Sequence, residues 1–278
     1  MRPMSEIHPS AVIGSNIQMG VGNRIGPHAV IEDGVKLGSH NVIHASAYLC
    51  RGTEIGSHNE IHMGAVIGHA PQDLAYRNAP SFTRIGDRNQ IREYATIHRG
   101  TKPETATVIG DENYLMAYCH IAHNCILGNQ IIMVNQASLT GYCVVEDQVF
   151  LSGMTGFHQF TRIGRLAMVS ALSVSNKDIP PFITCGGRPA LAVAVNLVGL
   201  KRAGISVHIR SEIKDAFKYL YRSGLTVPRA LEKIKAEFSS PEIQHLVRFT
   251  ETSKRGIISG AKDGEEVFLS RKNAGVID

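Results

Sequence analysis

Aliphatic side chains recur at every sixth position through the first part of the chain. The series begins at Ile7 and continues through Ile13, Met19, Ile25, Ile31, Leu37, Ile43, Leu49, Ile55, Ile61 and Ile67. A period of six matches neither the 3.6-residue repeat of a helix nor a single long strand, so each hexapeptide must be a short strand with a turn. Three such units close a triangular coil of about eighteen residues. The pattern therefore predicts a parallel β-helix of hexapeptide repeats.

Glycine and asparagine recur in phase with this series. Glycine directly follows the aliphatic residue at Gly14, Gly20, Gly26, Gly38, Gly56 and Gly68. We interpret these glycines as corners of the coil, because a positive φ costs glycine little. Asn23, Asn41 and Asn59 repeat at the interval of one whole coil. We expect them to occupy one corner in left-handed backbone, which asparagine tolerates.

The series is interrupted twice without losing phase. Residues 69–84 are polar, include two prolines and have Asp73 where an aliphatic is due; residues 99–107 have Pro103 at such a position. Since proline cannot donate to a strand ladder, both stretches are predicted to be loops that leave the coil. The repeat resumes after each and continues to Val169. It predicts roughly nine coils, about 43 Å long at ~4.8 Å between strands.

After Val169 the pattern changes. Residues 177–181, which include two adjacent prolines, are expected to end the strands, and the sequence Gly-Gly-Arg-Pro at 186–189 reads as a link. Apolar spacing then predicts helices over 206–222, 228–238 and 240–255. The predicted fold is mainly β, a β-helix over residues 1–185 with loops 69–84 and 99–107. An α-helical domain over 186–278 follows it.

Composition limits the partners. No apolar run approaches the ~20 residues of a membrane span, and no signal peptide is visible at the start, so we expect a cytoplasmic protein. The five cysteines form no CxxC pair, so neither a disulfide framework nor a thiolate metal site is indicated. From Gly199 onward there are 15 Lys and Arg against 10 Asp and Glu, whereas the earlier residues balance. Because aromatic residues are not interleaved with this positive charge, we expect an acidic protein partner and no nucleic acid.

Four histidines form the main candidate site. His98, His120, His123 and His158 each lie within two residues of a repeat aliphatic, so they can stack near one another across coils. Such a cluster favours acid–base chemistry. The alternative is zinc bound by His120, His123 and a third histidine. Because no carboxylate or thiolate supports that ligand set, we expect no metal.

Several segments together resemble one family, the UDP-N-acetylglucosamine acyltransferases, which perform the first step of lipid A synthesis. The resemblance reaches to about Gly256. The segments that carry it are IHPSAVI (7–13), IGHAPQDL (67–74), REYATIHRGT (92–101), HIAHNC (120–125), GMTGFHQF (153–160), DIPPF (178–182), NLVGLKRAG (196–204) and YRSG (221–224). The resemblance implies a left-handed β-helix and a homotrimer with active sites between neighbours. It also implies a helical domain that helps bind acyl carrier protein, whose phosphopantetheine carries the acyl donor, with no separate cofactor.

The resemblance also implies roles for individual residues. His123 matches the general base that deprotonates the sugar 3-hydroxyl before it attacks the (R)-3-hydroxyacyl thioester. The N–H of Gly141 matches the donor to the oxyanion. Ala171 matches a position at the floor of the acyl groove that limits chain length. The expected substrate-binding residues are Asp73, His98, His120, Asn135, His158, Gln159, Asn196 and Arg202, with Asn196 and Arg202 near the diphosphate.

Departures from the family pattern keep alternatives open. Asn124 stands where many members have an acid, which predicts a weaker base, and Tyr142 stands where they have a histidine. A UDP-sugar with a 3-amino group is therefore an alternative acceptor. A zinc hydro-lyase of the γ-carbonic anhydrase type and a non-catalytic scaffold that binds a carrier protein are alternatives of other classes. The later N-acyltransferase of the same pathway is the nearest alternative acyltransferase.

Overall fold

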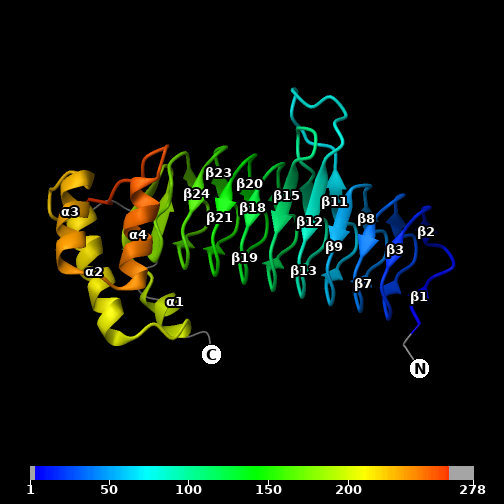
Figure 1. Ribbon diagram of the computed structural model, residues 1–278, viewed down its shortest axis with the longest axis horizontal. Coiled ribbons are helices and arrows are strands. Elements are labelled where there is room, and N and C mark those ends of the chain that lie inside the picture. Colours follow the sequence, from blue (N-terminus) through cyan, green and yellow to red (C-terminus); the bar gives the residue numbers. More distant parts are fainter. Residues whose placement is uncertain (1–3, 263–278) are drawn as a thin grey trace.

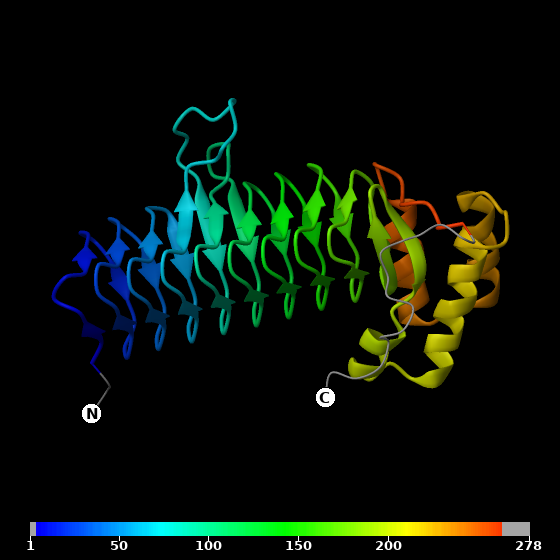
Figure 2. The same cartoon turned by 180° about the vertical axis from the view of Figure 1, so that it is seen from behind.

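The computed structural model describes residues 4–262. These residues form a long triangular prism of short strands with four helices at its C-terminal end (Figures 1 and 2). Each face of the prism is one sheet, and each coil contributes one strand to each face. The predicted β-helix is present.

The three sheets, named A, B and C, take every third strand in turn. Sheet A contains β1 (Glu6–Ile7), β4 (Arg24–Ile25), β7 (Val42–Ile43), β10 (Glu60–Ile61), β13 (Gln90–Ile91), β16 (Tyr114–Leu115), β19 (Ile132–Met133), β22 (Phe150–Leu151), β25 (Met168–Val169), β27 (Ile183–Gly187) and β28 (Ala190–Val195). Sheet B contains β2 (Val12–Ile13), β5 (Val30–Ile31), β8 (Tyr48–Leu49), β11 (Val66–His69), β14 (Thr96–His98), β17 (His120–Ile121), β20 (Ser138–Leu139), β23 (Gly156–Phe157) and β26 (Val174–Ser175). Sheet C contains β3 (Gln18–Met19), β6 (Lys36–Leu37), β9 (Thr53–Ile55), β12 (Phe82–Ile85), β15 (Ala106–Ile109), β18 (Ile126–Leu127), β21 (Val144–Val145) and β24 (Arg162–Ile163).

The repeat aliphatics fill the interior of the prism. Strands one coil apart pair in parallel and in register, so that Ile43 pairs with Ile61 and Ile61 with Ile91. All three are fully buried. Burying a side chain of this size stabilises a fold by about 1.5–3 kcal/mol. Because each aliphatic contacts its equivalents in the coils on either side, the core is a set of continuous columns.

Left-handed backbone occurs at the corners, but at a different position from most of the predicted glycines. A residue with positive φ lies three positions after most of the repeat aliphatics, as at Asn16 and Tyr94. Of the six glycines, Gly68 has positive φ, whereas the interpretation was wrong for Gly14, Gly20, Gly26, Gly38 and Gly56. A Cβ on Gly14 would lie 2.6 Å from the backbone of Asp33, in the next coil. These glycines are therefore required by the close approach of successive coils.

The repeating asparagines form a buried ladder, and the prediction of left-handed backbone for them was also wrong. Asn41 N–H donates to Asn23 Oδ1 (2.8 Å), and Asn59 N–H donates to Asn41 Oδ1 (2.8 Å). Each side-chain amide also donates to a backbone carbonyl near the corner, such as that of Gly56. The ladder continues through Asn89. It satisfies backbone groups that would otherwise be buried without partners.

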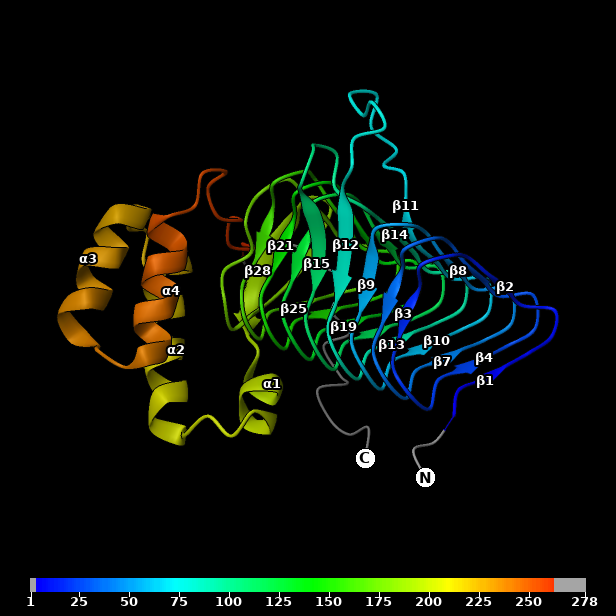
Figure 3. The same cartoon turned by 45° about the vertical axis from the view of Figure 1, so that its right-hand side comes forward.

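Both predicted loops leave the prism at the edge between sheets B and C, where the longer one projects far outward (Figures 1 and 3). They span residues 70–81 and 99–105, less than predicted, because the flanking strands extend and pair further. The loops hold each other: Ser81 Oγ donates to the Gly100 carbonyl (2.6 Å), and Glu104 N–H donates to the Pro80 carbonyl (2.9 Å).

Strands continue beyond the adjacent prolines. Pro180 and Pro181 precede β27, so their missing N–H groups fall outside the ladder. β27 pairs with β25 in parallel, and β28 pairs with β27 antiparallel. The predicted boundary between residues 185 and 186 therefore falls inside β27, and Arg188 and Pro189 form the turn of the hairpin.

The helices are α1 (Leu197–Arg202), α2 (Val207–Tyr221), α3 (Val227–Glu237) and α4 (Pro241–Glu251). The sequence predicted the last three. In the structure, Ser206 and Ser240 are N-caps whose side chains accept from Ile209 and Ile243 N–H. It missed α1 and placed the end of α4 too late. After α4 the chain returns to the prism, where Asp178 N–H donates to the Gly256 carbonyl (2.9 Å).

The asparagine ladder makes a testable contribution to stability. Asn59→Ala removes the acceptor of Asn89 N–H and its side-chain amide. We expect a loss of about 2–4 kcal/mol, because a buried donor is left without a partner. The measurement is urea unfolding followed by circular dichroism. The control is Asn176→Ala, whose exposed side chain makes no hydrogen bond to any other described residue. Equal stability of the two variants would contradict the role of the ladder.

Candidate active site

The edge between sheets B and C brings three predicted residues into one column. His123, Gly141 and Gln159 each lie two residues after a repeat aliphatic of sheet B. Those aliphatics, Ile121, Leu139 and Phe157, pair in register. The three residues are therefore stacked at successive coils, on the edge from which both loops project.

His123 is buried, with only 4% of its surface exposed, and lies against the longer loop. Its Nε2 is 3.5 Å from Oδ2 of Asp73. The other oxygen of that carboxylate accepts from Ala75 N–H (2.8 Å), which orients Asp73 within the loop. The loop thus places a negative charge opposite the imidazole.

The second nitrogen of His123 faces the neighbouring amide. Nδ1 lies 3.1 Å from Oδ1 of Asn124, which also accepts from the N–H and hydroxyl of Thr101 (3.0 and 2.9 Å). Because a carbonyl oxygen can only accept, Nδ1 carries the proton and the lone pair of the neutral ring lies on Nε2. Asn124 therefore keeps the acceptor that an acid would offer, without its charge.

Two aromatic side chains complete this edge. The ring of Tyr142 meets that of His123 edge to face at 5.3 Å, and its hydroxyl lies 3.0 Å from the Thr101 hydroxyl. Phe160 stacks on Tyr142 at 4.8 Å and remains 54% exposed. Sequence reasoning assigned no site role to Thr101 or Phe160. The sequence does indicate that Phe160 lies near Tyr142, because it follows Tyr142 by one coil. It does not indicate the contacts of Thr101, because these depend on the path of the shorter loop.

Gly141 lies directly against the imidazole. A Cβ at this position would overlap Cε1 of His123, so only glycine fits. Within residues 4–262 its N–H donates to no other group. The site thus offers an unused backbone donor beside a histidine with a free lone pair.

His98 and His120 lie on sheet B behind this edge. Their rings meet edge to face at 4.8 Å, and Thr96 Oγ1 is 2.7 Å from His120 Nδ1. Burial, together with the neighbouring histidines His120, His69 and His123, lowers the pKa of His98 to about 4. Burial is also the main cause of a lowered pKa for His120. Both rings are therefore neutral near pH 7.

The remaining predicted residues lie elsewhere in the chain. His158 is exposed near Gln159 on the same edge, whereas Asn135 and Ala171 are exposed at the opposite edge of sheet B, between sheets A and B. Asn196 and Arg202 belong to the α1 region, on the other side of the prism from the projecting loop (Figure 1). One chain therefore does not bring all predicted residues together.

The side chain of Asn196 is already engaged within the chain. Its Oδ1 accepts from Gly199 N–H at the start of α1 (3.0 Å), and its Nδ2 donates to the Leu166 carbonyl (2.9 Å). Arg202, at the end of α1, is exposed. Of the two, Arg202 is the one free to reach a ligand.

Among residues 4–262, the histidines around His123 are not in a group close enough to hold a metal ion. The only group of three His, Cys, Asp or Glu in residues 4–262 with ligand atoms within 4.8 Å of one another is His44, Glu60 and His62. His98, His120 and His123 do not meet that distance. The zinc alternative thus lacks a ligand set at the candidate site.

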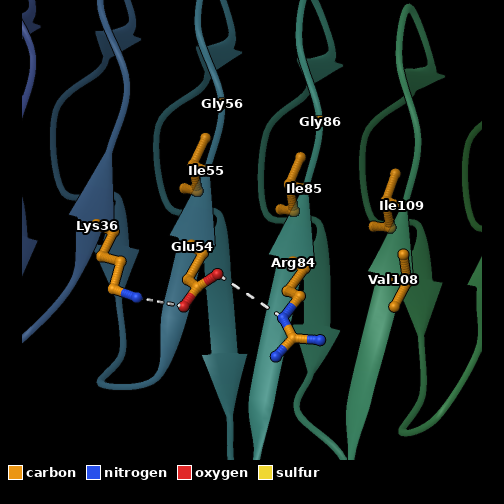
Figure 4. A pocket seen from close by; sticks show the side chains of 9 residues that line it. All are labelled: Lys36, Glu54, Ile55, Gly56, Arg84, Ile85, Gly86, Val108 and Ile109. Carbon is orange, nitrogen blue, oxygen red and sulfur yellow. Dashed lines mark hydrogen bonds and ion pairs between the residues drawn. The ribbon is translucent and has the colours of Figure 1, made fainter.

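Two surface pockets in the described part of the chain lie away from His123. A groove of about 440 Å³ lies on sheet C. Figure 4 shows the side chains that line it, among which Glu54 bridges Lys36 and Arg84. A second, of about 650 Å³, lies between the helices and residues 256–260. The site edge is exposed and needs a second wall to enclose a substrate.

The fold is a β-helix of hexapeptide coils, and its site has a buried histidine, an opposing carboxylate and a free backbone N–H. These features are typical of the hexapeptide-repeat acyltransferases. The family model described as "Udp N-acetylglucosamine O-acyltransferase; Domain 2" matches residues 178–258. An acyl-[acyl-carrier-protein]–UDP-N-acetylglucosamine O-acyltransferase of Janthinobacterium sp. is 47% identical over 261 residues, 92% of this chain and 100% of the relative. The relative from Gloeothece citriformis is 48% identical over 202 residues, 71% of this chain and 73% of its own.

Solved structures agree. The Francisella novicida UDP-N-acetylglucosamine acyltransferase has a TM-score of 0.88 at 32% identity and covers 97% of this chain and 100% of its own. The Campylobacter jejuni enzyme has a TM-score of 0.87 at 35% identity and covers 92% and 100%. The chain belongs to the UDP-N-acetylglucosamine O-acyltransferase family. The predicted fold class, a left-handed parallel β-helix with C-terminal helices, is confirmed.

Two composition-based expectations can be compared with the structure. In the described part of the chain, no helix has the length and apolarity that crossing a membrane requires. All five cysteines are free and buried. Burial raises the pKa of Cys119 to about 12, so this thiol is unreactive near neutral pH.

The buried His98 predicts a pH-dependent stability. The unfolded chain takes up a proton at this residue as the pH falls through about 6.5, whereas the folded pKa is about 4. The folded state, which keeps His98 neutral, is therefore not penalised above pH 6.5. Between pH 6.5 and 4 the unfolded chain binds the proton more readily, so the free energy of unfolding falls by up to about 3 kcal/mol. His98→Gln should show a shallower fall in unfolding free energy between pH 7 and 4. The exposed His8 supplies the control His8→Gln; equal slopes in both variants would contradict this assignment.

Proposed function

We propose that the protein transfers an (R)-3-hydroxyacyl chain from acyl carrier protein to the 3-hydroxyl of UDP-N-acetylglucosamine, the first step of lipid A biosynthesis. One observation carries this proposal: Nε2 of His123 faces Asp73 beside the unused N–H of Gly141, in a chain of this family. The relatives' names state the same donor and acceptor.

The geometry supports a direct transfer with His123 as base. Nε2 accepts the proton of the sugar 3-hydroxyl, and the oxygen attacks the thioester carbonyl. The Gly141 N–H donates to the oxygen that becomes negative, so the tetrahedral intermediate is stabilised. On collapse the C–S bond breaks, and the imidazolium returns the proton to the phosphopantetheine thiolate. No other cofactor is needed, since the thioester is already activated.

Two neighbours assist His123 in this mechanism. Asn124 holds the Nδ1 proton, which keeps Nε2 free as the base. Asp73 accepts a hydrogen bond from a sugar hydroxyl and lies close enough to stabilise the imidazolium when it forms. His98, His120, His158 and Gln159 line the sugar and nucleotide side of this edge.

A neighbouring copy supplies the second wall, in a homotrimer. The residues assigned to the acyl groove and diphosphate, among them Ala171 and Arg202, lie far from His123 within one chain, so a neighbour must contribute them. Apolar side chains exposed between sheets A and B support this packing: Tyr94, Tyr118, Met154 and Leu172. Leu74, beside Asp73 in the loop, is 97% exposed and would be covered by such a neighbour.

The helical part is the docking domain for acyl carrier protein in this proposal. Its net charge is positive, and Lys214 and Arg229 are exposed on α2 and α3. A basic surface attracts an acidic carrier. The cytoplasm is the proposed location, because free cysteines persist in a reducing compartment.

The transfer is tested with His123→Ala and a panel of substrates. Thioesters of several chain lengths are paired with UDP-N-acetylglucosamine and with its 3-amino analogue, and product is measured by mass spectrometry. Loss of the base should reduce kcat by about 10²–10⁴. His58→Ala, an exposed histidine of another edge, is the control. Activity of the parent protein on the 3-amino analogue alone would contradict the proposed acceptor. An unchanged kcat in His123→Ala would contradict the proposed mechanism.

Docking of the carrier predicts a salt effect. Because screening weakens attraction between exposed charges, kcat/KM should fall by about tenfold between low salt and ~0.5 M. The double variant Lys214→Glu/Arg229→Glu should lose this salt dependence, whereas Arg24→Glu, at the far end of the prism, should retain it. A rate of the parent protein that is independent of salt would contradict carrier docking on the helices.

A further inference from the structure

A second group of chemically active side chains lies on sheet A, remote from His123. Glu60 lies in β10 and His62 directly follows it, while His44 follows β7 in the adjacent coil. Since alternate residues of a strand face opposite sides, these side chains point outward while Ile43 and Ile61 point inward. The strands lie in the N-terminal half of the prism, on the face away from the projecting loop (Figure 3).

The three side chains converge. His44 Nε2 is 2.8 Å from Glu60 Oε1, and His62 Nε2 is 3.7 Å from the same oxygen. The two imidazoles stack at 4.6 Å with 22° between their planes. One ligand atom from each residue lies within 4.8 Å of the others. Ligands at ~2.0–2.2 Å from a tetrahedral zinc ion are about 3.3 Å apart, so small side-chain rotations would suffice.

The surroundings of His62 suit a metal ligand. Its Nε2 is buried and makes no hydrogen bond within the described residues. Its Nδ1 faces Oε1 of Glu93 at 3.7 Å. A carboxylate behind a histidine is the usual outer partner of a metal ligand, because it keeps the proton on the far nitrogen.

The local charges also suit a cation. Arg92 is the nearby positive group, and its guanidinium is paired with Glu93 at 2.8 Å. Glu60 is therefore left to face the two imidazoles of His44 and His62. An ion pair between His44 and Glu60 alone would explain one contact, but it leaves His62 Nε2 without a partner.

We propose that His44, Glu60 and His62 bind a divalent transition-metal ion, with Zn²⁺ the best match to two imidazoles and one carboxylate. This donor set leaves at least one coordination position for water. Water can reach it, because the side chains of His44 and Glu60 are 33% and 40% exposed. The ion would join two adjacent coils, and Glu93 would orient His62 from a third.

The chain offers a matched control for this site. His40 and His58 also stack across adjacent coils, at 5.1 Å, but no carboxylate pairs with them among the described residues. Stacking of two histidines is therefore a consequence of the repeat and does not by itself indicate a metal site. The carboxylates distinguish the proposed site.

The test is calorimetric titration of the full-length, metal-stripped protein with ZnCl₂, with MgCl₂ as the hard-cation comparison. We expect one Zn²⁺ per chain and little response to Mg²⁺. His44→Ala, Glu60→Gln and His62→Ala should each weaken binding by at least about tenfold, and Glu93→Gln by about tenfold through His62. His40→Ala/His58→Ala and His123→Ala should bind as the parent does. Circular dichroism in chelator shows that each variant is folded.

Three results would overturn the proposal. One is the absence of Zn²⁺ binding by the folded parent protein at micromolar concentration. Another is unchanged affinity in His62→Ala, and the third is an equal loss in His40→Ala/His58→Ala. The assay needs neither acyl donor nor sugar, so its outcome is independent of the proposed transferase activity.

Discussion

In-register parallel hydrogen bonding between successive coils is the constraint on which this structure depends. It places residues one coil apart directly over one another, as with Ile43, Ile61 and Ile91. The same register aligns the asparagine ladder, whose members satisfy one another's backbone groups. Each coil is therefore stabilised by its two neighbours, as is general in repeat architectures.

The same stacking creates chemistry on the outer surface. His123 and Gly141 meet because the aliphatics before them pair, and the absence of a Cβ at Gly141 allows the imidazole to lie against its backbone. His44 and His62 meet for the same reason on another face. In each case a carboxylate lies beside the pair: Asp73 opposite His123, and Glu60 against His44 and His62.

Flat faces also explain why one chain is an incomplete enzyme in this proposal. A prism filled with aliphatic side chains has no interior space for a substrate, and the described hollows do not include His123. The loop with Asp73 covers the base from one side only. The exposed Leu74 and the apolar edge near Tyr94 are surfaces that a neighbouring copy would bury.

The hexapeptide period by itself determined the three-sided prism and the places of the two loops, because the aliphatic side chain of each repeat must point into the interior. It also determined which residues share a column, such as His123 and Gly141. The tertiary structure decided contacts across different spacings, where loop paths matter: Asp73 against His123, Thr101 on Asn124 and the return of Gly256 to Asp178. It also decided the roles of the corner glycines and asparagines. Both roles depend on contacts with the next coil, and the backbone preference of a single residue does not predict such contacts.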